Sequence, residues 1–328
     1  MGTKTKKPPA PLAERIAAEI RKAMNDEEAA MTFGGQGLSS VREVMPTGIE
    51  VLDQHVLGIG GFPYGRIVEI FGPEDVGKSS LANQIMAAGQ RDGATALLGE
   101  AERKVQPGWV DLFGVSRKDV VLQPADTIEQ WCESVGVAVE KFGARHKLVA
   151  VLDSAAAPPP QKAFEEDLTD AEIPGAAGAA WSRCLRKLKY QISGKLVLIV
   201  LVNQLRSKIG VLFGPTEESP GGRAIKFHSS VRLIMGHGPH VKAGKATTGR
   251  WVSVRAVKNH LVSERRSARV LLDFQRGWDN DRSTLLFAKE TGIVDKKCRS
   301  LREARIGLGW GGEDGGADVR VDDVGEKE

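Results

Sequence analysis

Five short segments of the chain are almost continuously apolar, and the segments between them repeat their apolar residues with a helical period. The apolar segments are Arg66–Phe71, Ala94–Leu98, Val120–Gln123, Leu148–Asp153 and Leu196–Asn203. Runs of this kind are typical of parallel strands that are buried on both faces. The helical segments between them are Ser80–Gly89, Ile128–Phe142 and Ala176–Ile192. This alternation predicts an α/β fold with a mostly parallel, doubly wound sheet.

The two ends of the chain differ from this central pattern. At Leu12–Met24, apolar residues recur every four positions, which predicts an amphipathic helix that packs either on its own core or on a neighbouring subunit. After Gly222 the apolar segments become short and alternating or β-branched, which predicts antiparallel additions to the sheet. These segments are Ser229–Met235, Trp251–Val257 and Ala268–Phe274.

The pattern divides the chain into four predicted parts. They are a basic arm and helix (1–45), a core (46–275), a small C-terminal region with room for a helix or two (276–312), and an acidic tail (313–328). The tail contains seven acidic and two basic residues, a net charge of −5. Because the whole chain carries +4, the remainder carries +9. A basic body with an acidic tail favours a polyanionic partner, with which the tail would compete for the body. A tail that only improves solubility explains the charge equally well.

Composition excludes several classes of protein. The chain is 41% hydrophobic and 27% charged, which is typical of soluble globular proteins. No long apolar window predicts a membrane helix, and the start lacks the apolar region of a secretory signal. Cys132, Cys184 and Cys298 form no CxxC pair, so we expect no disulfide framework, no zinc site and a cytoplasmic location. Since no Cys, Asp or Glu cluster accompanies His237 and His240, we expect them in a hairpin loop rather than a metal site.

A phosphate-binding loop is the most specific motif that the residues show without reference to any family. Gly72-Pro73-Glu74-Asp75-Val76-Gly77-Lys78-Ser79 matches G-x-x-x-x-G-K-[ST] between a predicted strand and a predicted helix. In such a loop, backbone N–H groups surround the phosphates, and the helix N-terminus adds the positive end of its dipole. We therefore expect an ATP site that also includes Ser80. Lys78 should reach the β- and γ-phosphates, and Ser79 should bind Mg²⁺.

Carboxylates at two further strand ends complete the expected site. Asp153 ends a buried strand, where ligands bind in open α/β sheets, and it is the natural second residue for Mg²⁺, with a helix N-cap as the alternative. Glu100 and Glu102 follow another strand. Hydrolysis requires a carboxylate that orients water at the γ-phosphate, and the spacing does not choose between these two.

Two long connections are candidates for DNA binding. Residues 205–227 link two predicted strands and mix cations with apolar side chains, a combination that holds phosphates and stacks on bases. The cations are Arg206, Lys208, Arg223 and Lys226, and the apolar residues are Ile209, Val211, Leu212 and Phe213. A surface loop with a self-packed apolar cluster is the alternative. The other connection, residues 158–176, is a candidate only through the family resemblance described next. Because it is acidic, base insertion rather than phosphate attraction is its expected contribution.

Several motifs together resemble the RecA recombinase family, the bacterial and phage-encoded DNA strand-exchange ATPases. The resemblance covers residues 46 to 294. GRIVEIFGPEDVGKSSL is similar to the family's GRIVEIYGPESSGKTTL, and VLDSAAA is similar to its Walker-B run. NQLRSKIGVLFG followed by GGRAIKFHSSVRL is similar to the second DNA-binding loop and the next strand, and AVKNH to the VKNK signature. The resemblance implies a RecA-type P-loop ATPase core with an N-terminal oligomerisation helix.

The resemblance also assigns roles within the ATP site. EAERKVQPGWVDLFGV aligns with the segment that holds the catalytic glutamate, which falls on Glu102. Gln204 takes the γ-phosphate-sensing position, and Trp109 the aromatic that covers adenine. Lys258 matches the first of two lysines that reach the ATP of the neighbouring subunit, while His260 replaces the second. We expect His260 to act as a weaker, pH-dependent cation.

The remaining roles concern DNA and subunit contacts. Phe227 falls where an aromatic packs across the subunit boundary and couples ATP sites. Ile209 falls at a base-step wedge, and Arg186 matches a phosphate contact. The implied DNA-binding residues are Arg186, Arg206, Lys208, Ile209, Phe213, Gly221, Gly222, Arg223 and Lys226. In the first DNA loop, Ala179 stands where the family has an early arginine, so DNA contacts there rest on weaker grounds.

The function implied is ATP-dependent homologous recombination. ATP and Mg²⁺ are expected between successive subunits of a helical filament on single-stranded DNA, which pairs with a homologous duplex and exchanges strands. An open filament requires heterologous contacts that do not close into a ring. One alternative is a hexameric helicase of the same core fold. Another is an accessory protein that binds ATP without turnover, against which the presence of Lys78, Glu102 and Gln204 argues.

Overall fold

The structure is a computed structural model of the chain and describes residues 10–25, 30, 41–165, 175–207, 217–218, 222–310 and 320–321. It divides into two compact units, residues 1–41 and 42–328. The first unit contains the predicted amphipathic helix, α1 (Leu12–Met24), which ends in a left-handed Asn25. Its apolar stripe is open, because Leu12 and Met24 are 67% and 66% exposed. The helix therefore leaves an apolar face available to another surface.

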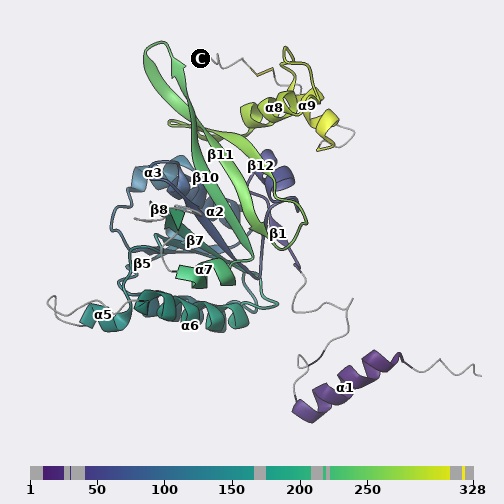
Figure 1. Cartoon of the computed structure of the whole chain (residues 1–328), viewed down its shortest axis with the longest axis vertical. Helices are drawn as coiled ribbons and strands as arrows, with labels where there is room; N and C mark the ends of the chain where they lie inside the picture. The colour runs from purple at the N-terminus through teal and green to yellow at the C-terminus, as the bar shows by residue number, and fades with distance from the viewer. Residues whose placement is uncertain are drawn as a thin grey trace, which may run out of the picture. The chain divides into compact units, whose positions relative to one another are not determined.

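The second unit is built on a sheet of nine strands in the order β13-β12-β11-β10-β3-β7-β6-β4-β5 (Figure 1). Every pairing from β10 to β5 is parallel, and β11, β12 and β13 are added antiparallel. The strands are β3 (Arg66–Gly72), β4 (Thr95–Glu100), β5 (Val120–Gln123), β6 (Leu148–Asp153), β7 (Val197–Gln204), β10 (Val231–Ala243), β11 (Ala246–Asn259), β12 (Ser267–Asp273) and β13 (Gly277–Asp279). Two-stranded ladders join β1 (Val44–Met45) to β2 (Phe62–Pro63) and β8 (Arg206–Ser207) to β9 (Glu217–Glu218).

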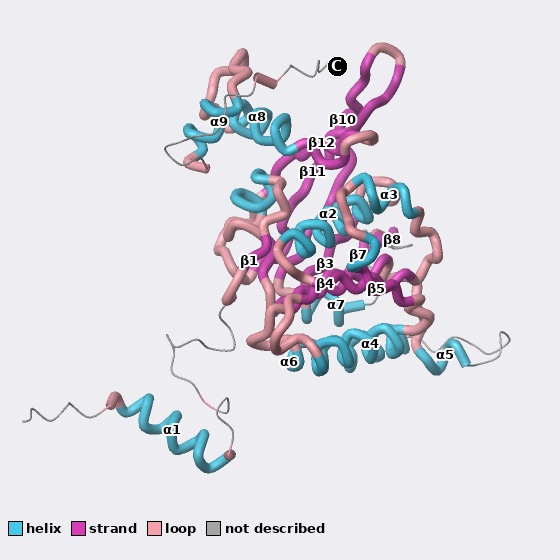
Figure 2. Tube along the Cα trace, turned by 180° about the vertical axis from the view of Figure 1, so that it is seen from behind, coloured by secondary structure: helices cyan, strands magenta, loops and turns pink. Residues whose placement is uncertain are grey.

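Helices cover both faces of the sheet, as predicted for a doubly wound fold (Figure 2). Alternate residues of β3 enter different cores: Val68 and Ile70 pack with α2 (Lys78–Arg91), whereas Ile67 packs with α4 (Ile128–Lys141) and α6 (Ala176–Gln191). Short helices complete the unit. They are η1 (Val51–Val56), α3 (Pro107–Leu112), η2 (Arg117–Asp119), α5 (Gln161–Glu165) and α7 (Gly222–His228). Helix α7 occupies the end of the segment 205–227, which was expected only as a long connection between strands.

The C-terminal region, predicted to have room for a helix or two, contains α8 (Asn280–Glu290) and α9 (Leu301–Leu308). They enclose a small cluster of their own around Leu285, Ala288 and Leu301. Side chains cap both helices, since Asp279 accepts from the amide of Arg282 and Ser300 accepts from that of Glu303. None of the helices within the described ranges is long and apolar enough to cross a membrane.

The hairpin of β10 and β11 differs from the prediction in two respects. Instead of being a purely antiparallel addition, β10 pairs parallel with β3 and antiparallel with β11. His237 and His240 were expected in a hairpin loop, but both lie within β10, and the turn follows Ala243. The sequence GHGPH suggests a turn because of its glycines and proline. It forms instead an irregularity in a long strand, where the pairing with β11 shifts register.

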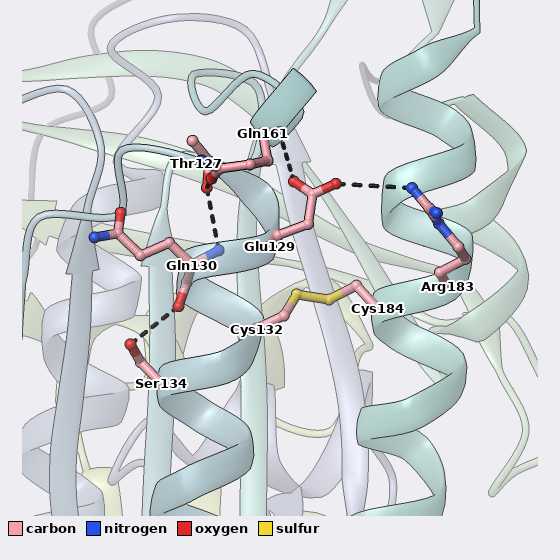
Figure 3. The surroundings of a disulfide bond; sticks show 8 residues. All are labelled: Thr127, Glu129, Gln130, Cys132, Ser134, Gln161, Arg183 and Cys184. Atoms are coloured by element: carbon pink, nitrogen blue, oxygen red, sulfur yellow. Dashed lines mark hydrogen bonds and ion pairs between the residues drawn. A yellow bond between two sulfur atoms is a disulfide. The ribbon is translucent and has the colours of Figure 1, made fainter. Parts of the chain in front are cut away.

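The expectation that the cysteines form no disulfides is also wrong. Cys132 of α4 and Cys184 of α6 form a disulfide with a Cα–Cα distance of 5.9 Å (Figure 3). This distance is within the usual range for disulfides. The two helices pack on the same face of the sheet, where Trp131 and Trp181 meet edge to face with ring centroids 6.0 Å apart. Cysteine spacing could not indicate the pairing because the packing of the two helices brings the residues together.

Candidate active site

The phosphate-binding loop connects β3 to α2 at the carboxyl ends of the parallel strands. Two of its residues have left-handed backbone conformations, Asp75 with φ of 54° and Gly77 with φ of 97°. Gly72 lies so close to the carbonyl oxygen of Met235 that a Cβ atom at Gly72 would overlap it. The loop is therefore held against the neighbouring strand β10, and a glycine is required at its start.

Lys78 and Ser79 begin α2 and face the end of β6. The Lys78 ammonium is buried and donates a hydrogen bond to the carbonyl of Pro73. Burial lowers the pKa of Lys78, and the nearby carboxylates, led by Asp153, oppose that shift. Burial raises the pKa of Asp153, while a hydrogen bond from the Ser79 hydroxyl lowers it. The structure thus joins a hydroxyl and a carboxylate beside a cation, as a site for a hard metal ion and phosphates requires.

The two glutamates after β4 have different surroundings. Glu100 is buried, and its Oε1 accepts a hydrogen bond of 3.0 Å from the backbone amide of Lys104, which stabilises the following turn. Glu102 faces the end of the sheet, where its Oε1 accepts from Ser154 Oγ at 2.8 Å and from Gln204 Nε2 at 3.3 Å. Of the two, Glu102 alone contacts side chains from the strand ends that flank the phosphate-binding loop.

Electrostatics keep Glu102 ionised. Burial raises the pKa of its carboxyl group, but hydrogen bonds from Lys104 and Ser154 and the charges of Lys104 and Lys78 outweigh burial, so the net pKa is below the ordinary value. The Lys104 ammonium lies 2.9 Å from Glu102 Oε2. A carboxylate with a lowered pKa accepts hydrogen bonds at neutral pH but takes up protons weakly. The environment therefore suits orientation of a water molecule.

Gln204 is positioned by a buried network beneath the site. Its backbone amide donates to Asn203 Oδ1 at 3.0 Å, and Asn203 Nδ2 donates to Glu69 Oε1 at 3.0 Å. The Glu69 carboxylate also pairs with Arg232, whose guanidinium lies over the ring of Phe71 at 4.4 Å. The network joins the middle of β3 and the end of β7 to the start of β10. It was not predicted from the sequence, although a glutamate inside the apolar run RIVEIF was a signal for it.

Trp109 and Ser80 are the other residues expected in the ATP site. Trp109 is on α3, is 37% exposed and contacts Phe113 edge to face at 5.6 Å. It therefore presents an accessible aromatic surface. Ser80 is buried in the first turn of α2. Within the described ranges, no group of three or more His, Cys, Asp or Glu side chains is arranged to hold a metal ion.

A basic surface lies on α6, α7 and the end of β11. Lys258 donates hydrogen bonds to the carbonyls of Lys226 and Phe227 at the end of α7. Burial and then neighbouring cations, including Lys189, lower the pKa values of both Lys258 and His260. His228 is similarly affected by burial and then by Lys189, Arg186 and Lys258. These shifts reflect burial first and repulsion among the cations second, and a polyanion would relieve the repulsion.

The candidate DNA-binding residues are only partly described. Arg186, Arg223, Lys226 and Phe227 are exposed on α6 and α7, and Phe227 is 74% accessible. Arg206 lies in β8 and Gly222 begins α7. The predicted residues Lys208, Ile209, Phe213 and Gly221 lie outside the described residues. Most of the first DNA loop, 158–176, is described, but residues 166–174 are not.

Comparison with known proteins decides the family. The model of the RecA N-terminal domain matches residues 13–279. The chain is 37% identical over 286 residues to Protein RecA of Thermus thermophilus, covering 87% of the chain and 82% of the relative. It is 35% identical over 298 residues to Protein RecA of Francisella tularensis subsp. novicida, covering 90% and 81%. A third relative, Protein RecA of Thermus aquaticus, is 38% identical over 270 residues, or 81% of the chain and 78% of the relative.

The chain belongs to the RecA family. It is a RecA recombinase built on the ATPase core of that family, and its resemblance to the family in the sequence motifs is confirmed. The family implies nucleotide binding with Mg²⁺. The residues present fit this combination, because the hydroxyl of Ser79 and the carboxylate of Asp153 are oxygen donors of the kind that Mg²⁺ prefers, and they meet beside Lys78.

Proposed function

We propose that this RecA-family chain couples hydrolysis of ATP to homologous pairing and strand exchange in a helical filament on single-stranded DNA. The observation that carries the proposal is the meeting of Glu102 and Gln204 at 3.3 Å beside Lys78, at the carboxyl ends of the central strands. The carboxylate of Glu102 has the chemistry to orient water, and the amide of Gln204 has the chemistry to detect a phosphate. Their contact links hydrolysis to the connection that follows Gln204.

In this mechanism, Lys78 and the backbone amides of the phosphate-binding loop bind the β- and γ-phosphates. Ser79 and Asp153 would hold Mg²⁺, and the ion would supply positive charge beside the phosphates. Glu102 accepts a hydrogen bond from the attacking water and orients it toward the γ-phosphate. Its lowered pKa keeps it an acceptor at neutral pH.

Gln204 is the proposed link between ATP and DNA. Its amide donates to Glu102 and would shift to a γ-phosphate oxygen when ATP is bound. The next residue, Leu205, donates its backbone amide to the carbonyl of Gly72 at 3.2 Å, so the start of the connection 205–227 is tied to the phosphate-binding loop. Rearrangement at Gln204 would therefore be transmitted to the basic residues proposed to bind DNA, Arg223 and Lys226 among them.

Self-assembly is supported by an apolar helix face and an apolar groove. Ile16 and Ile20 of α1 are exposed together with the ends of the stripe. A groove of about 900 Å³ lies between the edge strand β5 and α4. Its lining includes Val121, Leu122 and Phe142, which are all more than half exposed. We propose that α1 of one chain packs into this groove of the next, which produces heterologous contacts and an open filament.

The second subunit would also complete the ATP site. Lys258 and His260 lie on the basic surface at the end of β11. In the sequence they are far from the phosphate-binding loop of their own chain. We propose that they approach the triphosphate of the neighbouring chain and offset the charge that builds on the transferring phosphoryl group. Phe227, exposed on α7, would pack across the same boundary.

Electron microscopy tests this proposal. Wild-type protein mixed with single-stranded DNA and a slowly hydrolysed ATP analogue should form open helical filaments. In a separate reaction with ATP, it should exchange the strands of a homologous duplex but not of a heterologous one. Lys78→Ala should do neither. Closed rings and directional unwinding without a requirement for homology would indicate a helicase, and filaments without hydrolysis or exchange would indicate an accessory protein.

A further inference from the structure

An arginine on the β10–β11 hairpin contacts the phosphate-binding loop from outside (the hairpin is labelled in Figure 1). Arg250 Nη1 donates a hydrogen bond of 3.0 Å to the carbonyl oxygen of Asp75. The same guanidinium contacts two histidines, with Nη1 2.8 Å from His237 Nδ1 and Nη2 3.1 Å from His240 Nε2. None of these residues belongs to the ATP site proposed above except Asp75. The contact joins residues 175 positions apart in the chain.

A bulge in β10 makes the double histidine contact possible. In a regular strand, residues three positions apart point to opposite faces, so His237 and His240 could not both reach one side chain. Here His237 pairs with Val252 and His240 with Arg250, which leaves two residues of β10 opposite one of β11. This extra residue reverses the alternation of side chains between the two faces of β10, so His237 and His240 lie on the same face.

The residues of the bulge suit this geometry. A Cβ atom at Gly238 would lie 2.6 Å from the carbonyl oxygen of Trp251, so only glycine fits. Pro239 lacks the N–H group that a regular ladder requires, and proline is tolerated at bulges. The motif GHGPH therefore places two imidazoles on one side of the strand, where Arg250 lies between them and the loop.

The chemistry of the three side chains fixes their roles. A guanidinium only donates hydrogen bonds, so the two ring nitrogens that face it must accept. His237 and His240 therefore hold Arg250 as neutral imidazoles, and the planar fork of the guanidinium is fixed from two directions. With its orientation set in this way, Arg250 presents Nη1 to the Asp75 carbonyl.

The contact with Asp75 controls the next amide of the loop. The carbonyl of Asp75 and the N–H of Val76 belong to one planar trans peptide unit, so they point in opposite directions. An arginine that holds the carbonyl on the outer side keeps the N–H of Val76 turned to the other side. Asp75 has a left-handed φ of 54°, which is costly for a residue other than glycine and requires support from its surroundings.

We propose that Arg250, oriented by His237 and His240, is a positioning residue that keeps the phosphate-binding loop in its nucleotide-binding conformation. The inference rests on the proposed ATP site and adds three residues to it. Arg250 acts on the ground-state binding of the phosphates and does not touch Glu102 or Gln204. Its loss should therefore weaken nucleotide binding more than it slows the chemical step.

Nucleotide binding to the full-length chain tests the proposal. The dissociation constant of a fluorescent ADP is measured in Mg²⁺ without DNA, and the KM for ATP and kcat are then measured with saturating single-stranded DNA. Arg250→Ala should raise the dissociation constant and KM about tenfold, the low end of what a charged hydrogen bond contributes, with kcat within about twofold of wild type. Arg255→Ala, which removes an exposed arginine from the same strand, is the matched control and should bind ADP as wild type does.

Paired histidine variants keep the test decisive if Arg250→Ala fails to fold. In His237→Asn with His240→Gln, amide oxygens replace the ring acceptors, and affinity for ADP should be close to that of wild type. In His237→Leu with His240→Leu, the acceptors are lost, and affinity should fall toward that of Arg250→Ala.

The inference is overturned if Arg250→Ala or the leucine pair binds ADP within twofold of wild type, or if Arg255→Ala weakens binding equally. Failure of the wild type to bind ADP would instead refute the ATP site itself.

Discussion

Replacing Glu69 with glutamine should destabilise the whole ATPase core. Glu69 is fully buried in the central strand β3, and its carboxylate pairs with Arg232, whose side chain is 9% exposed. Glu69→Gln keeps the shape of the side chain and an oxygen for Asn203, but it removes the negative charge. Arg232 then loses the carboxylate that offsets its burial, although its contact with the ring of Phe71 is retained.

The free energy of unfolding that Glu69→Gln should lose follows from the burial of the ion pair. Breaking a buried ion pair by neutralising one partner costs about 3–5 kcal/mol, because the other charge loses its compensation. In a chain of this length, that loss corresponds to a decrease in Tm of roughly 4–7 °C. Glu290→Gln is the matched control, because its pair with Arg269 lies at the surface with both side chains 34% exposed. Such a pair contributes about 0–1 kcal/mol.

Urea denaturation followed by circular dichroism, together with thermal scans, measures these losses. If Glu69→Gln is no more destabilising than Glu290→Gln, the buried pair does not support the core as argued. A second comparison separates charge from packing. Glu69→Leu combined with Arg232→Met removes both charges and should recover much of the stability that Glu69→Gln loses. If the double variant is as unstable as Glu69→Gln, the loss is due to packing or hydrogen bonding instead.

Four further predictions concern ATP, DNA and pH. Lys78→Ala should abolish ATP turnover, because the phosphates lose their principal cation; turnover at the wild-type rate would refute the assignment. Glu102→Gln should slow hydrolysis at least a hundredfold while preserving ATP-dependent DNA binding, and a larger effect of Glu100→Gln would reverse the roles of the two residues. Deleting residues 313–328 should strengthen DNA binding at low salt, and equal affinities across a salt titration would leave only a role in solubility. Burial, and then the charges of Lys258 and Lys189, lower the pKa of His260 below its ordinary value of about 6.5. DNA-stimulated ATPase activity should therefore rise on acidification toward and below that pH in wild type but not in His260→Ala, measured at matched DNA saturation.

The central fold could be predicted because its signals are local. The apolar runs predicted five parallel strands, and the three long helices between them show their period directly. Four of these strands are largely buried as predicted. The prediction of burial is wrong for β5, because it forms the edge of the sheet, where Val121 and Leu122 are 54% and 62% exposed. Asp153 could be placed for the same reason, since the carboxyl ends of parallel strands share one edge of the sheet. The role of Gln204, in contrast, was implied only by the resemblance to the RecA family.

What could not be predicted depends on contacts between distant segments. The pairing of Cys132 with Cys184 follows from helix packing across 52 positions, and cysteine spacing carries no signal for it. The motif GHGPH has the composition of a turn, but the ladder with β11 continues before and after it and keeps it in a strand. The contact of Arg250 with Asp75 depends on that bulge, so no local pattern could indicate it.

The basic surface on α6, α7 and the end of β11 links the stability of the free chain to its affinity for polyanions. The pKa values of His228, Lys258 and His260 are all lowered, first by burial and then by neighbouring cations such as Lys189. A lowered pKa means that the charged form is disfavoured in the free chain. The histidines therefore reduce the stability of the fold as pH falls below their ordinary pKa of about 6.5, whereas Lys258 is charged and reduces it at neutral pH as well. A triphosphate or a DNA backbone placed against them would reverse the shift, because an opposite charge favours the protonated form. Binding should therefore be accompanied by proton uptake near neutral pH at the histidines, and the repulsion that destabilises the free chain becomes part of its affinity for polyanions.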